Sequence, residues 1–397
     1  MSIDKLQNPK VNQLVDTVNA LIDQKQDVLT AGTNISIETI PPSEPVDTRS
    51  TASIVTVGSN RWQGVAYGNG VYVAVGNDGY TAYSSDGTNW STPVQVGTNS
   101  WYSITFANGK FVSVGNTGYT TTTTDGQTWT TPTQISEVPD RLQQVRYGNG
   151  VFCAASWSNV TAASADGLTW TKSSNTGYRL GAVVYDGSQF VILGGISRGD
   201  GLIYTSPDGL TLTRTATISD LGNNPGAISY GNGVYIASNE SGQVSYSTNL
   251  TSWSSLSQIL RNIESIYYDG TQFIAVGRRA ITSSSYKYST ITTTDGINWT
   301  TPVDIGDSAS SSVITYGFLS ITSNGNGKFV AVGDNGATTT FEITYEQEGG
   351  TVINGAEIVS TVDPTSTNSE CVGAKLFYDT VGNIESALNT INSGSST

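Results

Sequence analysis

Histidine is absent from this chain of 397 residues, and cysteine occurs only twice, as Cys153 and Cys371. The lack of histidine excludes a Ser–His catalytic system, and two cysteines far apart in sequence imply neither a zinc site of the His/Cys kind nor a disulfide framework. The sequence also lacks a phosphate-cradling loop. We therefore expect neither a metal nor a cofactor.

Positive charge is scarce as well, because 18 Lys and Arg residues stand against 32 Asp and Glu, a formal net charge of −14. A nucleic-acid partner is not expected, since phosphates need a basic surface to neutralise them. No apolar run is long enough to cross a bilayer, and the N-terminus MSIDKLQNPK lacks the apolar core of a signal peptide. We expect a protein made in a cytoplasm, without membrane insertion.

One sequence motif, which we call the recurring phrase, is found along the chain: hydroxyl residues, then Asp-Gly, then tryptophan. The copies are YSSDGTNW (83–90), TTTDGQTW (122–129), ASADGLTW (163–170) and TTTDGINW (292–299), with weaker copies TSPDGLTL (205–212) and YSTNLTSW (246–253). The residues that define these turns are Asp86, Asp125, Asp166, Asp208 and Asp295, and Trp90, Trp129, Trp170, Trp253 and Trp299. The step of about 41 residues indicates a repeat architecture.

A second turn lies upstream in every repeat. These Asn-Gly or Asp-Gly pairs stand at 69–70, 108–109, 149–150, 186–187, 232–233, 269–270 and 326–327. Strand-like runs flank each pair, so each predicts a β-hairpin with a type I′ turn. A third run leads into the recurring phrase and a fourth follows it. Four antiparallel strands per repeat predict an all-β chain folded as a seven-bladed β-propeller.

The last repeat stops after its third strand. We expect the run STASIVTVG at 50–58 to supply the missing strand and close the ring, because an open ring would leave exposed strand edges. Six blades with a degenerate element is the alternative.

The recurring phrase resembles the Asp box of sialidases and related propellers, Ser/Thr-x-Asp-x-Gly-x-x-Trp, although here the glycine follows the aspartate directly. In such turns the carboxylate accepts backbone N–H groups, and the tryptophan packs over the neighbouring sheet. A structural role is favoured because the phrase repeats in most blades. The alternative makes each turn a calcium or sugar site.

The two ends differ from the repeats and predict short helices. Apolar residues recur at heptad-like spacing at both ends: Val11, Leu14, Val18 and Leu21, and then Phe377, Val381, Ile384, Leu388 and Ile391. Such stripes favour self-association, with packing on the chain's own domain as the alternative. The expected organisation is a coiled-coil helix (1–30), a β segment and linker (31–49), the propeller (50–347), a polar connector (348–369) and an oligomerisation helix (370–397).

The same ends carry a resemblance to a class of proteins. KVNQLVDTVNALIDQKQDVLTAGTNISI at 10–37 resembles the start of bacteriophage fibre proteins, and CVGAKLFYDTVGNIESALNTINSG at 371–394 is similar to the closing segment of many phage virion proteins. The resemblance implies a homotrimeric virion fibre, on tail or head, that joins other virion proteins through its N-terminal segment.

A ligand is expected on the propeller face that carries the loops between second and third strands, because these loops vary between repeats. Candidate binding residues there are Arg61, Trp62, Trp101, Arg141, Trp157, Arg179, Arg198, Arg278 and Arg279. Arginine forks bind carboxylates and aromatic rings stack on sugars, so an acidic host-surface glycan is a fitting guest. The alternative is that these arginines pair with local acids such as Asp140, Asp200 and Glu264.

Three functions remain open. The preferred one is a non-enzymatic adhesin, and the first alternative is a decorating or joining protein that contacts other virion proteins. The second is a sialidase-like glycan-cleaving spike, for which the acids on that face are Asp78, Asp200, Glu240, Glu264 and Asp334. No motif assigns any of them an acid or base role, so an enzyme is not expected.

Overall fold

The computed structural model describes residues 35–39, 46–195, 199–221, 225–239, 241–281, 286–305, 317–344 and 351–355. The chain divides into two compact units, Pro45–Thr344 and a second unit made of both ends, Met1–Glu44 and Tyr345–Thr397. Within the second unit, β1 (Ile35–Thr39) pairs with β31 (Thr351–Gly355) as an antiparallel ribbon. The predicted helices at the two ends lie outside the described residues.

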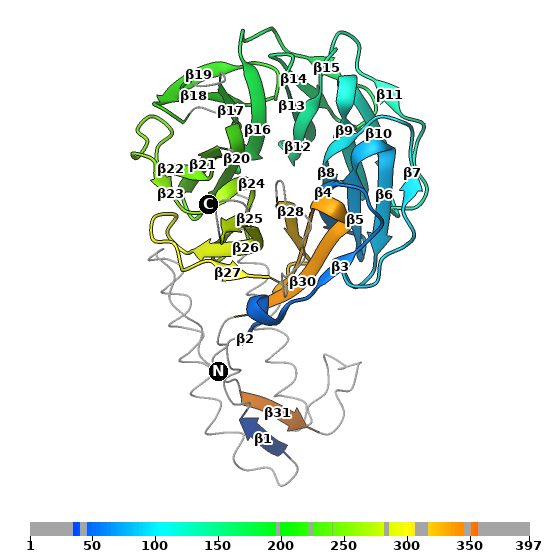
Figure 1. The fold of residues 1–397 in the computed structure, drawn as a ribbon, viewed down its shortest axis with the longest axis vertical. Coiled ribbons are helices and arrows are strands. Elements are labelled where there is room, and N and C mark those ends of the chain that lie inside the picture. The colour runs from blue at the N-terminus through cyan, green and yellow to red at the C-terminus, as the bar shows by residue number, and fades with distance from the viewer. Residues whose placement is uncertain are drawn as a thin grey trace, which may run out of the picture. The chain divides into compact units, whose positions relative to one another are not determined.

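The unit Pro45–Thr344 is a ring of seven antiparallel sheets, which confirms the predicted seven-bladed propeller (Figure 1). The first, innermost strands are β4 (Trp62–Gly68), β8 (Trp101–Ala107), β12 (Leu142–Gly148), β16 (Arg179–Tyr185), β20 (Pro225–Gly231), β24 (Arg261–Tyr268) and β28 (Phe318–Ser323). The second strands are β5 (Val71–Gly76), β9 (Lys110–Gly115), β13 (Val151–Ser156), β17 (Phe190–Gly195), β21 (Val234–Asn239), β25 (Phe273–Ala280) and β29 (Lys328–Gly333). We number the blades 1 to 7 in this order.

The outer half of each blade follows the same order. The third strands are β6 (Tyr80–Ser84), β10 (Tyr119–Thr123), β14 (Thr161–Ser164), β18 (Gly201–Ser206), β22 (Gln243–Ser247), β26 (Tyr286–Thr293) and β30 (Ala337–Thr344). The fourth strands of blades 1 to 6 are β7 (Val94–Gln95), β11 (Thr133–Gln134), β15 (Thr171–Lys172), β19 (Thr213–Ile218), β23 (Ser257–Gln258) and β27 (Val303–Asp304). In the described part of the chain, no helix is long and apolar enough to span a membrane.

Chain residues from before blade 1 complete blade 7. The strand β3 (Ile54–Thr56) pairs antiparallel with β30, as expected for the run at 50–58, and β2 (Val46–Asp47) pairs with the far end of the same strand. Figure 1 shows these early segments in blue beside β30 in orange. The ring is therefore closed by hydrogen bonds between residues from opposite ends of the propeller sequence.

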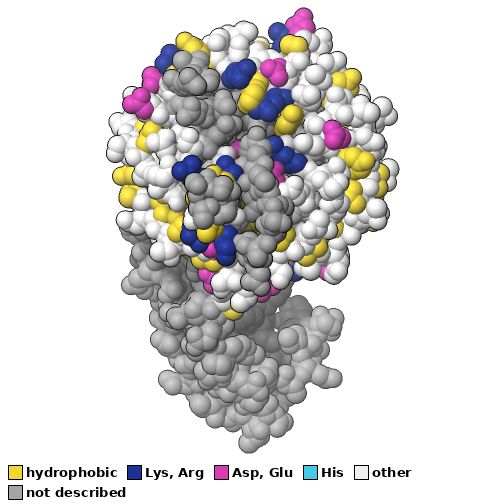
Figure 2. Space-filling view, in the orientation of Figure 1, with side chains coloured by type: hydrophobic (Ala, Val, Ile, Leu, Met, Phe, Trp, Pro, Cys, Tyr) yellow, Lys and Arg dark blue, Asp and Glu magenta, His cyan; other side chains and the backbone are white. Residues whose placement is uncertain are grey.

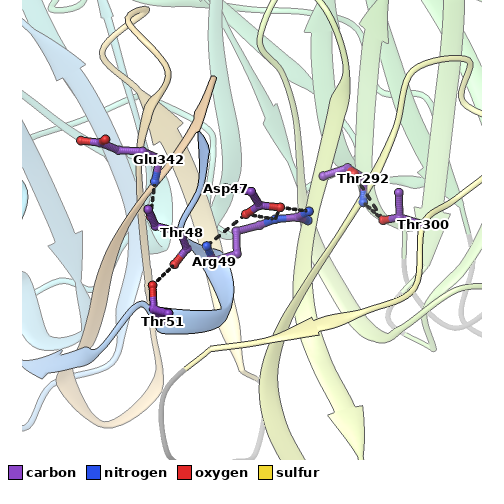
Figure 3. A network of polar contacts seen from close by, with 7 residues as sticks. All are labelled: Asp47, Thr48, Arg49, Thr51, Thr292, Thr300 and Glu342. Carbon is purple, nitrogen blue, oxygen red and sulfur yellow. Dashed lines mark hydrogen bonds and ion pairs between the residues drawn. The ribbon is translucent and has the colours of Figure 1, made fainter. Parts of the chain in front are cut away.

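A short polar network secures this closure (Figure 3). Thr48 exchanges two hydrogen bonds with the backbone of Glu342, its N–H reaching the carbonyl at 3.0 Å and its hydroxyl accepting the Glu342 N–H at 2.8 Å. The buried Arg49 forms a two-pronged ion pair with Asp47, with Nε 2.9 Å from Oδ1 and Nη2 2.7 Å from Oδ2. These contacts fix the turn between β2 and β3.

The hydrophobic core lies between neighbouring blades. One cluster combines Val73 and Val75 of blade 1 with Trp101, Ile104 and Phe111 of blade 2, all buried. Polar side chains also link blades, since the backbone N–H groups of residues 65, 145 and 183 donate to Ser320, Ser103 and Gln144 of the preceding blade. Each blade is thus held by its two neighbours.

Candidate functional site

The recurring Asp-Gly turns use their carboxylates internally. In the first copy, Oδ1 of Asp86 accepts the N–H groups of Thr88 at 2.8 Å and Asn89 at 2.7 Å, while Ser84 accepts the N–H of Gly87 at 2.8 Å. Nε1 of Trp90 then donates to the carbonyl of Gly87 at 2.9 Å. The carboxylate, the glycine and the tryptophan therefore stabilise one turn together.

The same arrangement recurs in other blades, and its hydrogen bonds lower the pKa of the aspartate. In blade 3 the N–H groups of Thr169 and Leu168 lower the pKa of Asp166 to about 2. The glycine of each turn also lies close to the preceding blade: a Cβ on Gly87 would stand 2.4 Å from Cγ2 of Val330. Among the described residues, no group of three or more acids or cysteines is placed to hold a metal ion.

The opposite face, which we call the loop face, carries the starts of the first strands. Here Trp157, from the loop after β13, is flanked by two guanidinium groups. The Cζ of Arg141 lies 3.1 Å from the centroid of the tryptophan ring, and the Cζ of Arg179 lies 4.6 Å from it. Arg141 also lies 5.1 Å over the ring of Tyr102. We call Tyr102, Arg141, Trp157 and Arg179 the mouth cluster.

The side chains of the mouth cluster are held by stacking, and part of the cluster is exposed to solvent. Arg141 and Trp157 are half-buried, whereas Arg179, at the start of β16, is exposed. Guanidinium planes that stack on an aromatic face keep their N–H edges available for hydrogen bonds. The arrangement can therefore hold a cation in a fixed orientation toward an anionic ligand. On the propeller face seen in Figure 2, several Lys and Arg side chains gather near the centre, although the whole chain is acidic.

Other predicted arginines are paired with acids. Nε of Arg61 lies 3.2 Å from Oδ1 of Asp334, a buried carboxylate of blade 7. Arg279 donates through Nε to Asp304 at 2.9 Å, and this pair lowers the pKa of Asp304. Local pairing thus holds for two arginines, though not with the acids that the sequence suggested.

Arg278 and Arg279 do not lie in a loop between second and third strands. Both belong to β25, which continues through Ala280 and pairs them with Tyr288 and Lys287 of β26. The hairpin is longer than its neighbours because ladder hydrogen bonds continue where other blades have already turned. The guanidinium of Arg278 lies 3.9 Å over the ring of Tyr286.

Trp62 and Trp101 do not belong to the site. Both side chains are fully buried between blades, and their indole N–H groups donate to the carbonyls of Val57 at 3.0 Å and Val96 at 3.2 Å. A ring without exposed surface is not available to stack on a sugar. Arg198 lies outside the described residues.

A channel on the propeller axis was missed by the sequence analysis. Its volume is about 300 Å³, and it is lined by residues of all seven first strands. Polar lining residues include Gln63, Tyr102, Thr105, Gln143, Arg146, Glu264, Tyr267 and Thr322. Tyr102 belongs both to this lining and to the mouth cluster. The signal was present, since polar residues recur at positions that a core-facing strand would fill with apolar ones.

No family model matches this chain, and no curated protein matches it. Among solved structures, YCF48 from Cyanidioschyzon merolae is 15% identical with a TM-score of 0.52, covering 73% of this chain and 98% of that one. A structure described as YCF48 bound to D1 peptide is 13% identical with a TM-score of 0.56, covering 76% and 97%.

The WD40 β-propeller domain of Doa1 is 11% identical with a TM-score of 0.54, covering 75% of this chain and 97% of that domain. At such low identity these likenesses establish the fold and no ligand. The chain is a seven-bladed β-propeller with four-stranded antiparallel blades.

Proposed function

We propose that this chain is a non-enzymatic subunit of a bacteriophage fibre, made in the host cytoplasm and carried on the virion. Its ends hold three copies together and join other virion proteins, and its propeller binds an acidic host-surface glycan. The resemblance of the two terminal segments to phage proteins supports the first part. The hydrogen bonding of the Asp-Gly turns supports their likeness to Asp-box turns.

The mouth cluster carries the binding proposal. Arg179 is exposed, and no ion pair joins it to a carboxylate of the described residues. Its stacking on Trp157 orients the guanidinium without consuming its hydrogen-bond donors. A carboxylate on a sugar ring would accept these donors in a bidentate manner. Three propellers on one fibre would raise the apparent affinity of weak single sites.

The test is binding of the full chain to an array of sialylated, uronic-acid and matched neutral glycans, and to host cells. Arg179→Gln should weaken binding to acidic glycans about tenfold or more, because one charge-assisted hydrogen-bond pair is lost. Arg214→Gln is the matched control, since Arg214 is exposed on β19 at the outside of blade 4. Equal binding by both variants would contradict the proposal.

Two other results would assign a different role. Failure to bind any glycan or host cell, together with retention on purified virions, would favour a decorating or joining protein. Release of reducing sugar from host polysaccharide would favour a glycan-cleaving spike.

A further inference from the structure

The axial channel is lined by a cationic side chain. Arg146, at the fifth position of β12, lines the channel, and one of its nitrogens donates to its own chain neighbour, the carbonyl of Val145, at 2.9 Å. No carboxylate of the described residues lies within ion-pair distance of it. Separation from bulk solvent lowers the pKa of Arg146 to about 10, so the group remains charged at neutral pH. An enclosed unpaired cation favours an anion beside it.

Neighbouring side chains at the same level add hydrogen-bond donors. Thr105, Tyr267 and Thr322 line the same channel, and each pairs, as Arg146 does, with the residue that follows a phenylalanine of the second strand. Tyr267 lies near enough to interact electrostatically with Arg146. Hydroxyl groups donate readily to an oxyanion, so this level offers one guanidinium and three hydroxyls.

The acid of the channel lies at another level. Glu264 lies three residues before Tyr267 in β24, which corresponds to about 10 Å along a strand. At that second level, the side-chain oxygen of Gln143 is buried and has no hydrogen-bond partner among the described residues. A bound water or a ligand hydroxyl at that oxygen would satisfy it.

We propose that the channel binds one small oxyanion, of carboxylate, phosphate or sulfate type, against Arg146 and the hydroxyls of Thr105, Tyr267 and Thr322. All three chemistries present an oxygen pair that fits the guanidinium fork. A volume of about 300 Å³ is at the lower limit for small-molecule pockets, which restricts the occupant to a small solute. This site is separate from the mouth cluster, because no member of the anion-binding set belongs to that cluster.

The experiment is thermal unfolding of the full chain against increasing sodium sulfate, sodium phosphate or sodium glycerate at constant ionic strength. We expect saturable stabilisation by at least one of these salts, which distinguishes a bound ion from a general salt effect. Arg146→Gln should remove the saturable part, or shift its half-saturation at least tenfold. Arg179→Gln should retain it, so failure of the glycan proposal would not affect this result.

A second substitution at the same position tests whether the protein still folds without the guanidinium. Arg146→Met should leave the protein folded and more stable than wild type in anion-free buffer, because it replaces an unpaired enclosed charge by an apolar chain. Crystals of the full chain soaked in selenate should show anomalous density beside the guanidinium. Absence of that density, or the same saturable response in wild type and Arg146→Gln, would overturn the proposal.

Discussion

The two faces of the propeller differ in how they use the repeat. On the face with the Asp-Gly turns, successive blades repeat the same contacts: a carboxylate within its own turn and a glycine against the preceding blade. On the loop face, equivalent positions have diverged: Arg61 is paired with Asp334, whereas Arg141 and Arg179 stack on Trp157. The first face maintains the ring, and the second is free to specialise.

The largest effect is expected when a buried tryptophan of the core is replaced, and a tryptophan of the loop face serves as the comparison. Trp62→Ala removes a fully buried side chain and should cost about 4 kcal/mol of unfolding free energy. Trp157→Ala should cost about 1 kcal/mol or less, because its ring is half-buried at the surface. Denaturant unfolding measures both. Similar losses in the two variants would contradict the division between core and site.

The contact between a turn glycine and the preceding blade can be tested with two glycines that both have a left-handed backbone conformation. Gly87 and Gly70 have φ of +78° and +79°, but only Gly87 has a neighbour where a Cβ would be placed. Gly70→Ala should cost about 1 kcal/mol from backbone strain alone. Gly87→Ala should cost about 3 kcal/mol, since overpacking against Val330 is added. Equal losses would show that the approach between blades is unimportant.

Low pH should reduce the stability that the Asp-Gly turns contribute. The pKa of Asp166 is about 2 when folded, below the value of about 4 for an unfolded aspartate. Its stabilising contribution is therefore present above about pH 4 and is lost as pH falls through about 2. Between those values, Asp166→Asn should lose less stability than wild type in urea unfolding. An unchanged pH dependence would mean that the carboxylate does not hold its turn.

The smallest effect is expected for the longest hairpin. Arg279→Gln breaks the ion pair with Asp304 near the surface, which should cost less than about 1 kcal/mol. The loss should shrink further in high salt, because exposed charges are screened. A thermal unfolding series in low and high salt measures both. A loss that does not depend on salt would indicate that packing, not charge, is the main contribution.

The blade count and the closing strand were predictable because turn residues repeat at a fixed step and one strand was left over. The site was less predictable, as Trp62 illustrates. Each first strand carries a β-bulge near its start, so Trp62 and Gly64 pair with consecutive residues of β5. The extra residue, Gln63, lines the channel while Trp62 turns into the core. A simple alternation of faces does not reveal such a bulge.

Arg146 was missed for a related reason. Its strand, LQQVRYG, has the same outline as WYSITFA and WQGVAYG, and this outline predicts only one strand of a hairpin. Whether a fifth-position side chain faces a neighbouring blade or an axial space depends on the closed ring. The distances between non-neighbouring blades that create the channel are not encoded in any one repeat.

The closure of blade 7 also affects how such a chain can change over generations. The propeller begins at Val46 and ends at Thr344, and these two residues pair with each other. The whole ring is therefore an insertion whose two junctions are adjacent, the arrangement that tolerates exchange of one domain for another. Recombination at this single point could replace the propeller with an unrelated module, while the terminal segments kept their own sequence.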